Sequence, residues 1–335
     1  MSGGFFLFEL PELNIGGLKA KYPIIQGGMA IRISGSKLAG AVAREGGIGV
    51  IAGIAMSPKE LEKEIKEARE KSEGKGLLGI NVLYAVSNFA ELIKTGMKAG
   101  IDLVLQGAGF SRDIYDWGRK FNVPIVPIVS SASLAKLAQK LGAAAVVVEG
   151  FEAGGHLGTD RPMLDILPEV VKAVKIPVIA AGGILHGQDI YRVLKMGAQG
   201  VQMGTRFAAS KESGAPDNYK QLYLEAKPED SILINSPVGL PGRGIRNFLT
   251  ERLFAGEKIK INKCTKCMKK CSQTFCIREA LENAQEGRIK EGIIFAGKRV
   301  AEIKDILSVK EIFDNLKKEF SEACRQNLAV ESILP

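Results

Sequence analysis

The amino-acid sequence predicts a (β/α)8 barrel, a closed ring of eight parallel strands surrounded by helices, with a helical cap inserted after the eighth strand. From residue 22 onward, short apolar runs alternate with amphipathic runs, the pattern of strands joined by helical crossovers. A doubly wound sheet is the other fold with this pattern, but eight runs favour the closed barrel. Glycines also gather at the ends of several runs, where the loops of a barrel bind ligands.

The expected elements follow in order along the chain. Strands are expected at residues 22–28, 48–53, 77–83, 102–109, 124–131, 143–150, 177–183 and 200–207. Helices are expected between them, at residues 34–45, 58–71, 88–99, 112–121, 133–141, 163–175 and 187–196. Gly100, Gly142 and Gly197 each end one of these helices, because glycine readily takes the left-handed conformation that closes a helix.

Three segments are expected along the chain, and the barrel occupies residues 1–210. Residues 211–299 are richer in Lys, Pro and Cys and hold few strand-like runs, so we expect a helical cap there. Apolar residues at helical spacing return after that segment. A helix at 300–325 is therefore expected to complete the barrel after a long insertion.

The composition is that of an ordinary globular chain. Of 335 residues, 46% are hydrophobic and 25% charged, and no apolar run approaches the roughly 18 residues that span a membrane. The first ten residues have neither a basic start nor a small-residue cleavage site, which argues against a secretory signal. We therefore expect a cytoplasmic protein without a membrane partner, and a homodimer is left open.

The formal net charge of +9 raises the question of nucleic-acid binding. Much of the excess is local, because Lys and Arg outnumber Asp and Glu in residues 251–304, whereas residues 305–335 are slightly acidic. No basic strand with interleaved aromatic residues accompanies it. We expect no nucleic-acid partner, and the positive charge suits an anionic cofactor or substrate.

Gly154-Gly155-His156 follows a strictly apolar run at 143–148 that is expected to be a buried strand. Glycines around it clear side-chain bulk from the strand's exit, so a flat ligand can approach the backbone. His156 is one of only two histidines, and its ordinary pKa near neutrality makes it a candidate general base. A histidine that merely closes a loop is the alternative.

Two further glycine sites favour a phosphate. The loops after strands seven and eight often hold one in a barrel, and here they contain Gly182, Gly183, Gly204 and Thr205. Glycines that only end strands tightly are the alternative.

A ring-binding platform is expected near that phosphate site. Gly27, Gly28 and Met29 end strand one without bulk, and the amides of Asn81 and Gln106 can both donate and accept hydrogen bonds. A phosphate site beside such a cavity suggests a flavin mononucleotide, FMN.

Four motifs together resemble the nitronate monooxygenase family, formerly called 2-nitropropane dioxygenases. The same motifs occur in the related FMN-dependent enoyl-acyl-carrier-protein reductases. The resemblance covers residues 15 to about 320 and implies a (β/α)8 barrel with non-covalent FMN under a cap. The motifs are Ile25-Gln26-Gly27-Gly28-Met29, Glu152-Ala153-Gly154-Gly155-His156, Ala181-Gly182-Gly183-Ile184 and Gly204-Thr205-Arg206-Phe207.

The resemblance also implies roles for single residues. His156 matches the catalytic histidine, which removes the proton next to the nitro group before the flavin takes electrons. Ser130 and Glu149 fall where the family lines the flavin and its ribityl chain, although some members have a lysine in place of Ser130. The remaining flavin contacts implied are Gly27, Gly28, Met29, Asn81, Gly154, Gly182, Gly183, Gly204 and Thr205.

A cysteine cluster is the other strong feature of the sequence. The spacing Cys264-x2-Cys267-x3-Cys271-x4-Cys276 suits the ligands of an iron–sulfur cluster or of zinc. Nearby lysines, including Lys263, favour the thiolate form. Free cysteines and a disulfide are the alternatives. A bound metal is expected to be mainly structural, because the phosphate and histidine motifs lie elsewhere in the sequence.

Three functions remain in competition. The leading hypothesis is an FMN-dependent enzyme that oxidises alkyl nitronates or nitroalkanes with dioxygen. The second is an NAD(P)H-dependent reductase of enoyl thioesters carried on acyl-carrier protein. The third is a flavin-binding sensor or scaffold without catalysis. The segment 236–243 and the cysteine-rich region look more like the bacterial nitronate branch and favour the first hypothesis.

Overall fold

The fold is a closed barrel of parallel strands, as the sequence predicted. The computed structural model describes residues 8–107, 109–261 and 264–331, with side chains to residue 327. Within these residues, eight strands close in the order β10-β11-β3-β4-β5-β6-β7-β8. Their bounds are β3 Ile24–Gln26, β4 Ile48–Ala52, β5 Leu77–Val82, β6 Leu103–Gln106, β7 Ile125–Val129, β8 Val146–Glu149, β10 Val178–Ala181 and β11 Gly200–Met203.

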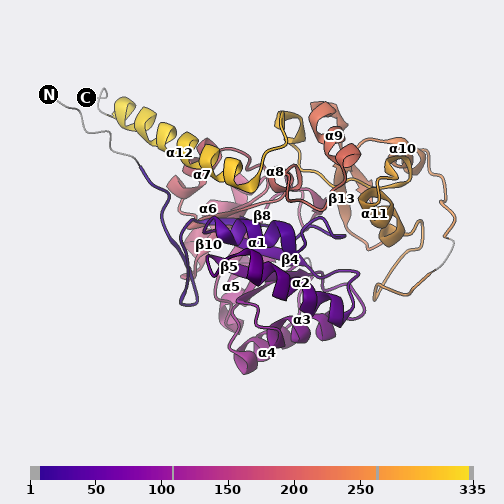
Figure 1. Ribbon diagram of the computed structural model, residues 1–335, viewed down its shortest axis with the longest axis horizontal. Coiled ribbons are helices and arrows are strands. Elements are labelled where there is room, and N and C mark those ends of the chain that lie inside the picture. The colour runs from indigo at the N-terminus through magenta and orange to yellow at the C-terminus, as the bar shows by residue number, and fades with distance from the viewer. Residues whose placement is uncertain (1–7, 108, 262–263, 332–335) are drawn as a thin grey trace.

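Helices surround the barrel (Figure 1). They are α1 Ser36–Arg44, α2 Pro58–Lys71, α3 Phe89–Lys98, α4 Asp113–Phe121, α5 Ala132–Leu141, α6 Met163–Ala173, α7 Gly187–Lys195 and the short α8 Thr205–Ala208. After a long insertion, α12 (Val309–Glu331) packs against α7 and α1. Most strands and helices lie inside or close to the ranges expected from the apolar pattern. Residues 205–207, expected to end strand eight, instead belong to α8, and the helix expected at 300–325 begins only at residue 309 and continues to 331. Ala108, in the expected strand 102–109, lies outside the described residues, as do Lys263 and the first seven residues.

A hairpin that the sequence analysis did not predict packs on the barrel's interior. It pairs β1 (Leu13–Ile15) with β2 (Leu18–Ala20) around Gly16 and Gly17. Both glycines have positive φ, +58° and +89°, as a two-residue hairpin turn requires. The buried side chains of the hairpin join the inward-facing residues of the strands in one apolar cluster. The barrel therefore has a packed core, and the space for a ligand lies beyond it.

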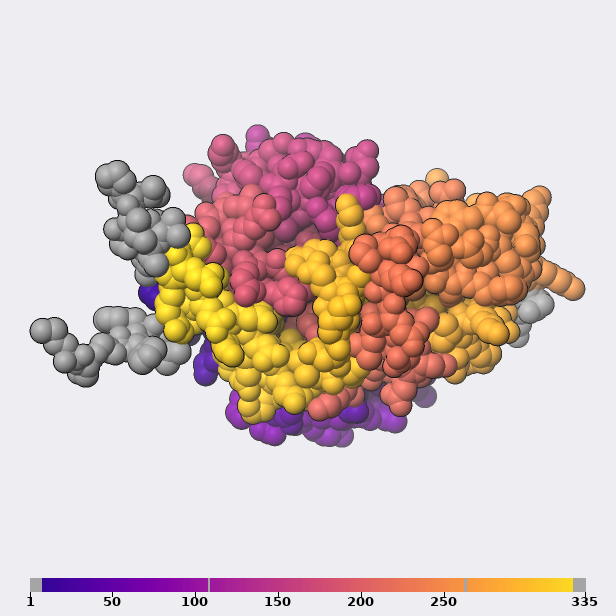
Figure 2. Space-filling model, turned by 90° about the horizontal axis from the view of Figure 1, so that it is seen from above, coloured from indigo at the N-terminus to yellow at the C-terminus, as the bar shows by residue number. Residues whose placement is uncertain are grey.

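In its described residues, the cap contains three α-helices and a small sheet. Its helices are α9 (Asp217–Glu225), α10 (Phe248–Phe254) and α11 (Ile277–Gln285), with short 3-10 turns η1 (Pro228–Asp230), η2 (Ile289–Glu291) and η3 (Val300–Glu302). Figure 2 shows most of this segment as an orange lobe at one end of the molecule. No helix among the described residues is long and apolar enough to cross a membrane.

The cap sheet joins the insertion to the barrel. Strands β12 (Ser231–Asn235) and β13 (Pro241–Ile245) pair with each other, and β13 also pairs with β9 (Gly155–His156) from the loop after β8. The sequence of β13 has two glycines and gave no strand signal. Those glycines make room, since a Cβ on Gly244 would lie 2.6 Å from the Ile294 carbonyl oxygen.

Candidate active site

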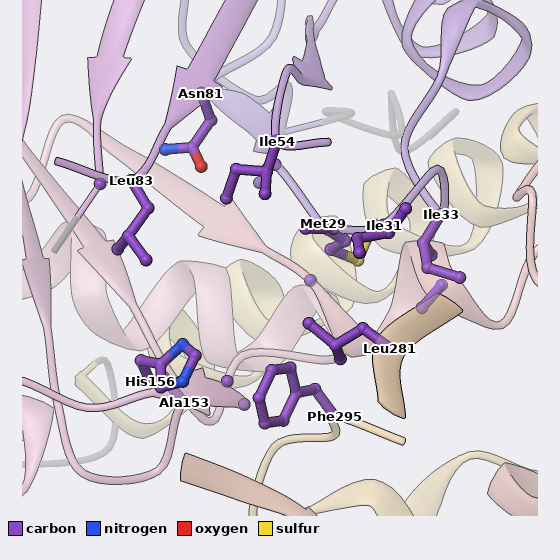
Figure 3. Close-up of a pocket in the computed structure, with 18 of the residues that line it drawn as sticks. Met29, Ile31, Ile33, Ile54, Asn81, Leu83, Ala153, His156, Leu281 and Phe295 are labelled. Carbon is purple, nitrogen blue, oxygen red and sulfur yellow. The ribbon is translucent and has the colours of Figure 1, made fainter. Parts of the chain in front are cut away.

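A cavity of about 700 Å³ lies at the carboxyl ends of the strands, between the barrel and the cap. The loops after β3, β5, β8, β10 and β11 form one wall, and cap residues such as Leu281 and Phe295 form another. In Figure 3, Asn81 and Leu83 lie on one side of this space, and His156 and Phe295 lie opposite them. The size and the mostly apolar wall with a few polar groups are typical of a cofactor and substrate site.

The loop after β3 provides the expected platform. Gly27, Gly28 and Met29 all line the cavity. A Cβ on Gly28 would lie only 2.4 Å from the Asn81 Cβ, so only glycine lets this backbone pass so close. Asn81 donates from Nδ2 to the Leu105 carbonyl at 3.1 Å, which fixes its amide at the cavity wall.

The predicted phosphate residues converge at another part of the cavity. Gly182 and Gly183 have φ of +99° and +71°, and both line the space with Gly204 and Thr205. A Cβ on Gly204 would meet only the Met29 sulfur, at 3.8 Å, so its backbone faces open space. These positions leave room for a ligand to approach the main chain.

Arg299 adds a positive charge that the sequence analysis missed. It lies directly before η3 (Val300–Glu302) and lines the cavity, and its Nη1 donates to the Gly183 carbonyl at 2.5 Å and to Asp189 Oδ1 at 2.7 Å. Its Nε donates to Glu302 Oε1 at 2.7 Å, and bonds to these carboxylates raise the arginine's pKa. These two carboxylates balance the charge of the guanidinium, so the arginine acts here mainly by fixing the Gly183 loop to the cap. No sequence motif marks this arginine, because it comes from the cap.

His156 is held in the cavity wall by the cap sheet. Its strand β9 pairs with β13, and its Nε2 lies 2.8 Å from Ser236 Oγ. The ring also packs edge-on against Phe295, with centroids 5.2 Å apart. Burial lowers the pKa of His156 to about 4, so the imidazole is neutral at pH 7. A neutral ring in this position can accept a proton.

Glu149 ends β8 and lines the same cavity. Burial raises the pKa of its carboxyl to about 8, which keeps it protonated at neutral pH. A protonated carboxyl can donate a hydrogen bond to a ligand as well as accept one. The cavity therefore holds a neutral base and a neutral acid, whose pKa values burial displaces in opposite directions.

Two expected flavin contacts do not line this cavity. Gln106 is buried at the end of β6, where its Nε2 donates to the Gly109 carbonyl at 3.4 Å. Ser130 lies beside Gly158, since a Cβ there would be 3.7 Å from the serine Oγ. The other expected contacts, including Gly154, do line the cavity. Gly154 must be small, because a Cβ on it would lie 2.6 Å from the Ala296 carbonyl carbon in the cap.

Gln202 was also missed, and it provides a test of whether a flavin fits. Its side chain lines the cavity, and its Oε1 is buried without a hydrogen-bond partner among the described residues. A buried orphaned acceptor normally has a ligand or water partner. A flavin ring edge carries both donors and acceptors, so the site fits that group. A polar residue inside the apolar strand 200–203 was the available sequence signal.

The four clustered cysteines surround a second, smaller hollow. Cys264, Cys267, Cys271 and Cys276 all line it, and all are free thiols. Cys267 lines the main cavity as well. In the described part of the chain, no three His, Cys, Asp or Glu side chains are grouped as a single metal ion requires.

A capped, glycine-lined cavity at the carboxyl ends of barrel strands, with a half-buried histidine in its wall, is typical of an enzyme that binds a cofactor and a small-molecule substrate. Known proteins agree with this class. A family model described as "Nitronate monooxygenase" matches residues 12–100 and 74–319. The chain belongs to the nitronate monooxygenase family.

Individual relatives differ in what they are named for. FabK from Thermotoga maritima has a similar structure, with a TM-score of 0.82 and 30% identity over 93% of this chain and 96% of that one. The nitroalkane oxidase of Streptomyces ansochromogenes has a TM-score of 0.78 and 25% identity, covering 92% and 98% of the two chains. In Mycobacterium tuberculosis, (3aS,4S,5R,7aS)-5-hydroxy-7a-methyl-1-oxo-octahydro-1H-indene-4-carboxyl-CoA dehydrogenase is 30% identical over 243 residues, 72% of this chain and 67% of that protein.

Proposed function

We propose that the protein is an FMN-dependent enzyme that oxidises alkyl nitronates, and the nitroalkanes that yield them, with dioxygen as the electron acceptor. The observation that carries the proposal is His156, which Ser236 and Phe295 hold in the wall of the cavity beside the glycine loops. Family membership and the likeness to a nitroalkane oxidase support the same chemistry.

The residues that would hold FMN are those with open backbone at the cavity. Gly182, Gly183 and Gly204 would bind the phosphate, Arg299 would hold the Gly183 loop in place, and the Gly27–Met29 loop would support the ring. Gln202 Oε1 would gain the hydrogen-bond partner that it lacks. When bound, the flavin supplies a two-electron acceptor.

His156 would remove the proton on the carbon next to the nitro group. A neutral imidazole has one N–H and one lone pair, and the tautomer whose Nε2 donates to Ser236 Oγ leaves the Nδ1 lone pair to accept that proton. Phe295 packs edge-on against the ring, and the apolar side chains of Ile31, Ile33 and Leu281 line another part of the cavity. The same apolar wall suits an alkyl chain on the substrate.

Purification and oxygen uptake test this proposal. The protein is expected to be yellow, with FMN released on denaturation and therefore bound non-covalently, and to consume oxygen with propyl-2-nitronate. A colourless protein that takes up no added FMN would contradict the cofactor assignment. A yellow protein without oxygen uptake on nitronates would contradict the substrate assignment alone.

Reduction of a trans-2-enoyl thioester by NAD(P)H is the second candidate. The likeness to FabK over 93% of this chain favours it. Glu149 is relevant here, because a carboxyl that stays protonated at pH 7 could donate to a thioester carbonyl. NAD(P)H consumption that depends on a crotonyl thioester, without oxygen uptake on nitronates, would support this candidate over the first.

A further inference from the structure

The segment 264–276 brings four cysteines around one partly open hollow. Cys264, Cys267, Cys271 and Cys276 line a space of about 500 Å³, in a part of the cap without helix or strand. Phe275 and Ile277 close its apolar side. The remaining cysteine, Cys324, lies on α12 and does not line the hollow.

Backbone bonds fix this segment against the barrel. The Ser87 amide donates to the Cys267 carbonyl at 2.9 Å, and Ser87 Oγ donates to the Lys266 carbonyl at 2.7 Å. The Lys269 amide donates to the Ala85 carbonyl at 2.8 Å, and its ammonium lies 3.5 Å from the centre of the Tyr84 ring. The cysteine segment is therefore docked on the loop between β5 and α3.

We propose that the four thiolates ligate an iron–sulfur cluster in this hollow. A single zinc ion needs four sulfurs that converge on one point, each about 2.3 Å from the metal. Here the four thiols surround a space instead. Thiols around a space suit a polynuclear cluster. Both the [2Fe–2S] and the [4Fe–4S] cluster are held by four cysteines.

The surroundings of the hollow match the charge of such a cluster. Lys266, Lys269 and Lys270 line it, and a cluster with four thiolate ligands is an anion. Cys276 caps the N-terminus of α11, where its sulfur accepts a hydrogen bond from the Glu279 amide at 3.5 Å. Amide hydrogen bonds to sulfur are a normal part of these sites.

The position of the cluster gives it a structural role with a direct link to the main cavity. Lys266, Cys267 and Met268 line the hollow and also the larger cavity, so the two spaces share a wall. The cysteines therefore border the main cavity in space, although their motif lies elsewhere in the sequence than the histidine and phosphate motifs. A cluster would anchor this part of the cap, and with it the wall beside the proposed flavin site.

Metal analysis of anaerobically purified, full-length protein tests the proposal. Iron and acid-labile sulfide are expected in stoichiometric amounts, directly or after reconstitution with ferrous iron and sulfide, with an electron paramagnetic resonance signal on reduction. Cys267→Ser combined with Cys271→Ser should reduce both to background. Cys324→Ser is the matched control and should keep both. Cluster loading should also raise the thermal midpoint of the wild type.

Each alternative site has its own result. Stoichiometric zinc without sulfide in the wild type would refute the cluster, and so would four titratable thiols that remain after reconstitution. Both are measured on the wild type, so neither result depends on whether the variants fold. Full iron in the double variant would refute these ligands. Cluster formation without any rise in the thermal midpoint would refute the structural role. None of these outcomes depends on the nitronate assay, so the cluster and the proposed function are tested separately.

Discussion

Replacing His156 with alanine is expected to separate proton transfer from flavin binding. The His156 side chain is held by Ser236 and Phe295 rather than by the glycines that would bind the phosphate, so the variant should keep its FMN. Loss of a positioned base costs about 10²–10⁴-fold, equivalent to roughly 3–5 kcal/mol of transition-state stabilisation. That loss should appear in kcat/KM for a neutral nitroalkane. It should shrink when the nitronate anion is supplied, because that substrate has already lost its proton.

The same substitution changes how stability depends on pH. The folded-state pKa of His156 is about 4, below its ordinary value of 6.5, so its stabilising contribution is complete above pH 6.5 and falls as the pH drops toward 4. The loss amounts to about 2 kcal/mol at pH 5 and about 3 kcal/mol at pH 4. The alanine variant has no ring to protonate. At pH 7.5 it should be less stable than the wild type, because it lacks the contacts with Ser236 and Phe295.

Urea unfolding of both proteins at pH 7.5 and pH 5 measures this effect, and oxygen uptake on the two substrates measures catalysis. The stability difference between wild type and variant should narrow by about 2 kcal/mol on going to pH 5. Ser236→Ala is the control, since it removes the hydrogen bond but leaves the buried ring. A difference that stays constant with pH would refute a buried neutral imidazole. Equal activity losses on nitroalkane and nitronate would show that His156 positions the substrate or the flavin instead.

Two further changes test other parts of the cavity. Burial raises the pKa of Glu149 from 4.5 to about 8. The free energy of unfolding of the flavin-free wild type should therefore fall by up to about 5 kcal/mol as the pH rises from 4.5 through 8, and that of Glu149→Gln should not. Urea-unfolding profiles that run parallel for the two proteins would contradict this. Gly204→Ala should weaken FMN binding about tenfold or more with little change in thermal midpoint, because the new methyl group would point into the open cavity. An unchanged FMN affinity, measured by fluorescence titration, would mean that the phosphate binds elsewhere. Gly28→Ala is the contrast: it should lower the thermal midpoint as well, since its Cβ meets Asn81 at 2.4 Å.

Much of the barrel was predictable because its signals are local. Apolar runs such as 143–148 read as buried strands, and helix-ending glycines such as Gly142 punctuate the chain between them. Strand-end glycines were informative for the same reason. Where the backbone must approach a ligand closely or take a positive φ, residues with a side chain are disfavoured, so glycine marks such positions in the sequence. Gly182, Gly183, Gly204 and the Gly154-Gly155-His156 motif all line one cavity in the structure.

The cap and its contribution to the site depended on contacts between distant segments. Strand β13 forms despite its glycines because β12 and β9 pair with its two edges, and that pairing sets His156 beside Ser236. Arg299 reaches the cavity only because the cap folds back over the end of β10. Cys267 lines the same cavity only because Ser87 holds the cysteine segment 264–276 on the barrel. The sequence by itself determined the barrel and its glycine-lined cavity, since turn geometry and apolar periodicity are properties of neighbouring residues. Only the tertiary structure decided that Arg299, Ser236 and Cys267 lie at or beside that cavity. These residues come from a long insertion, and no local sequence pattern encodes how that insertion packs on the barrel.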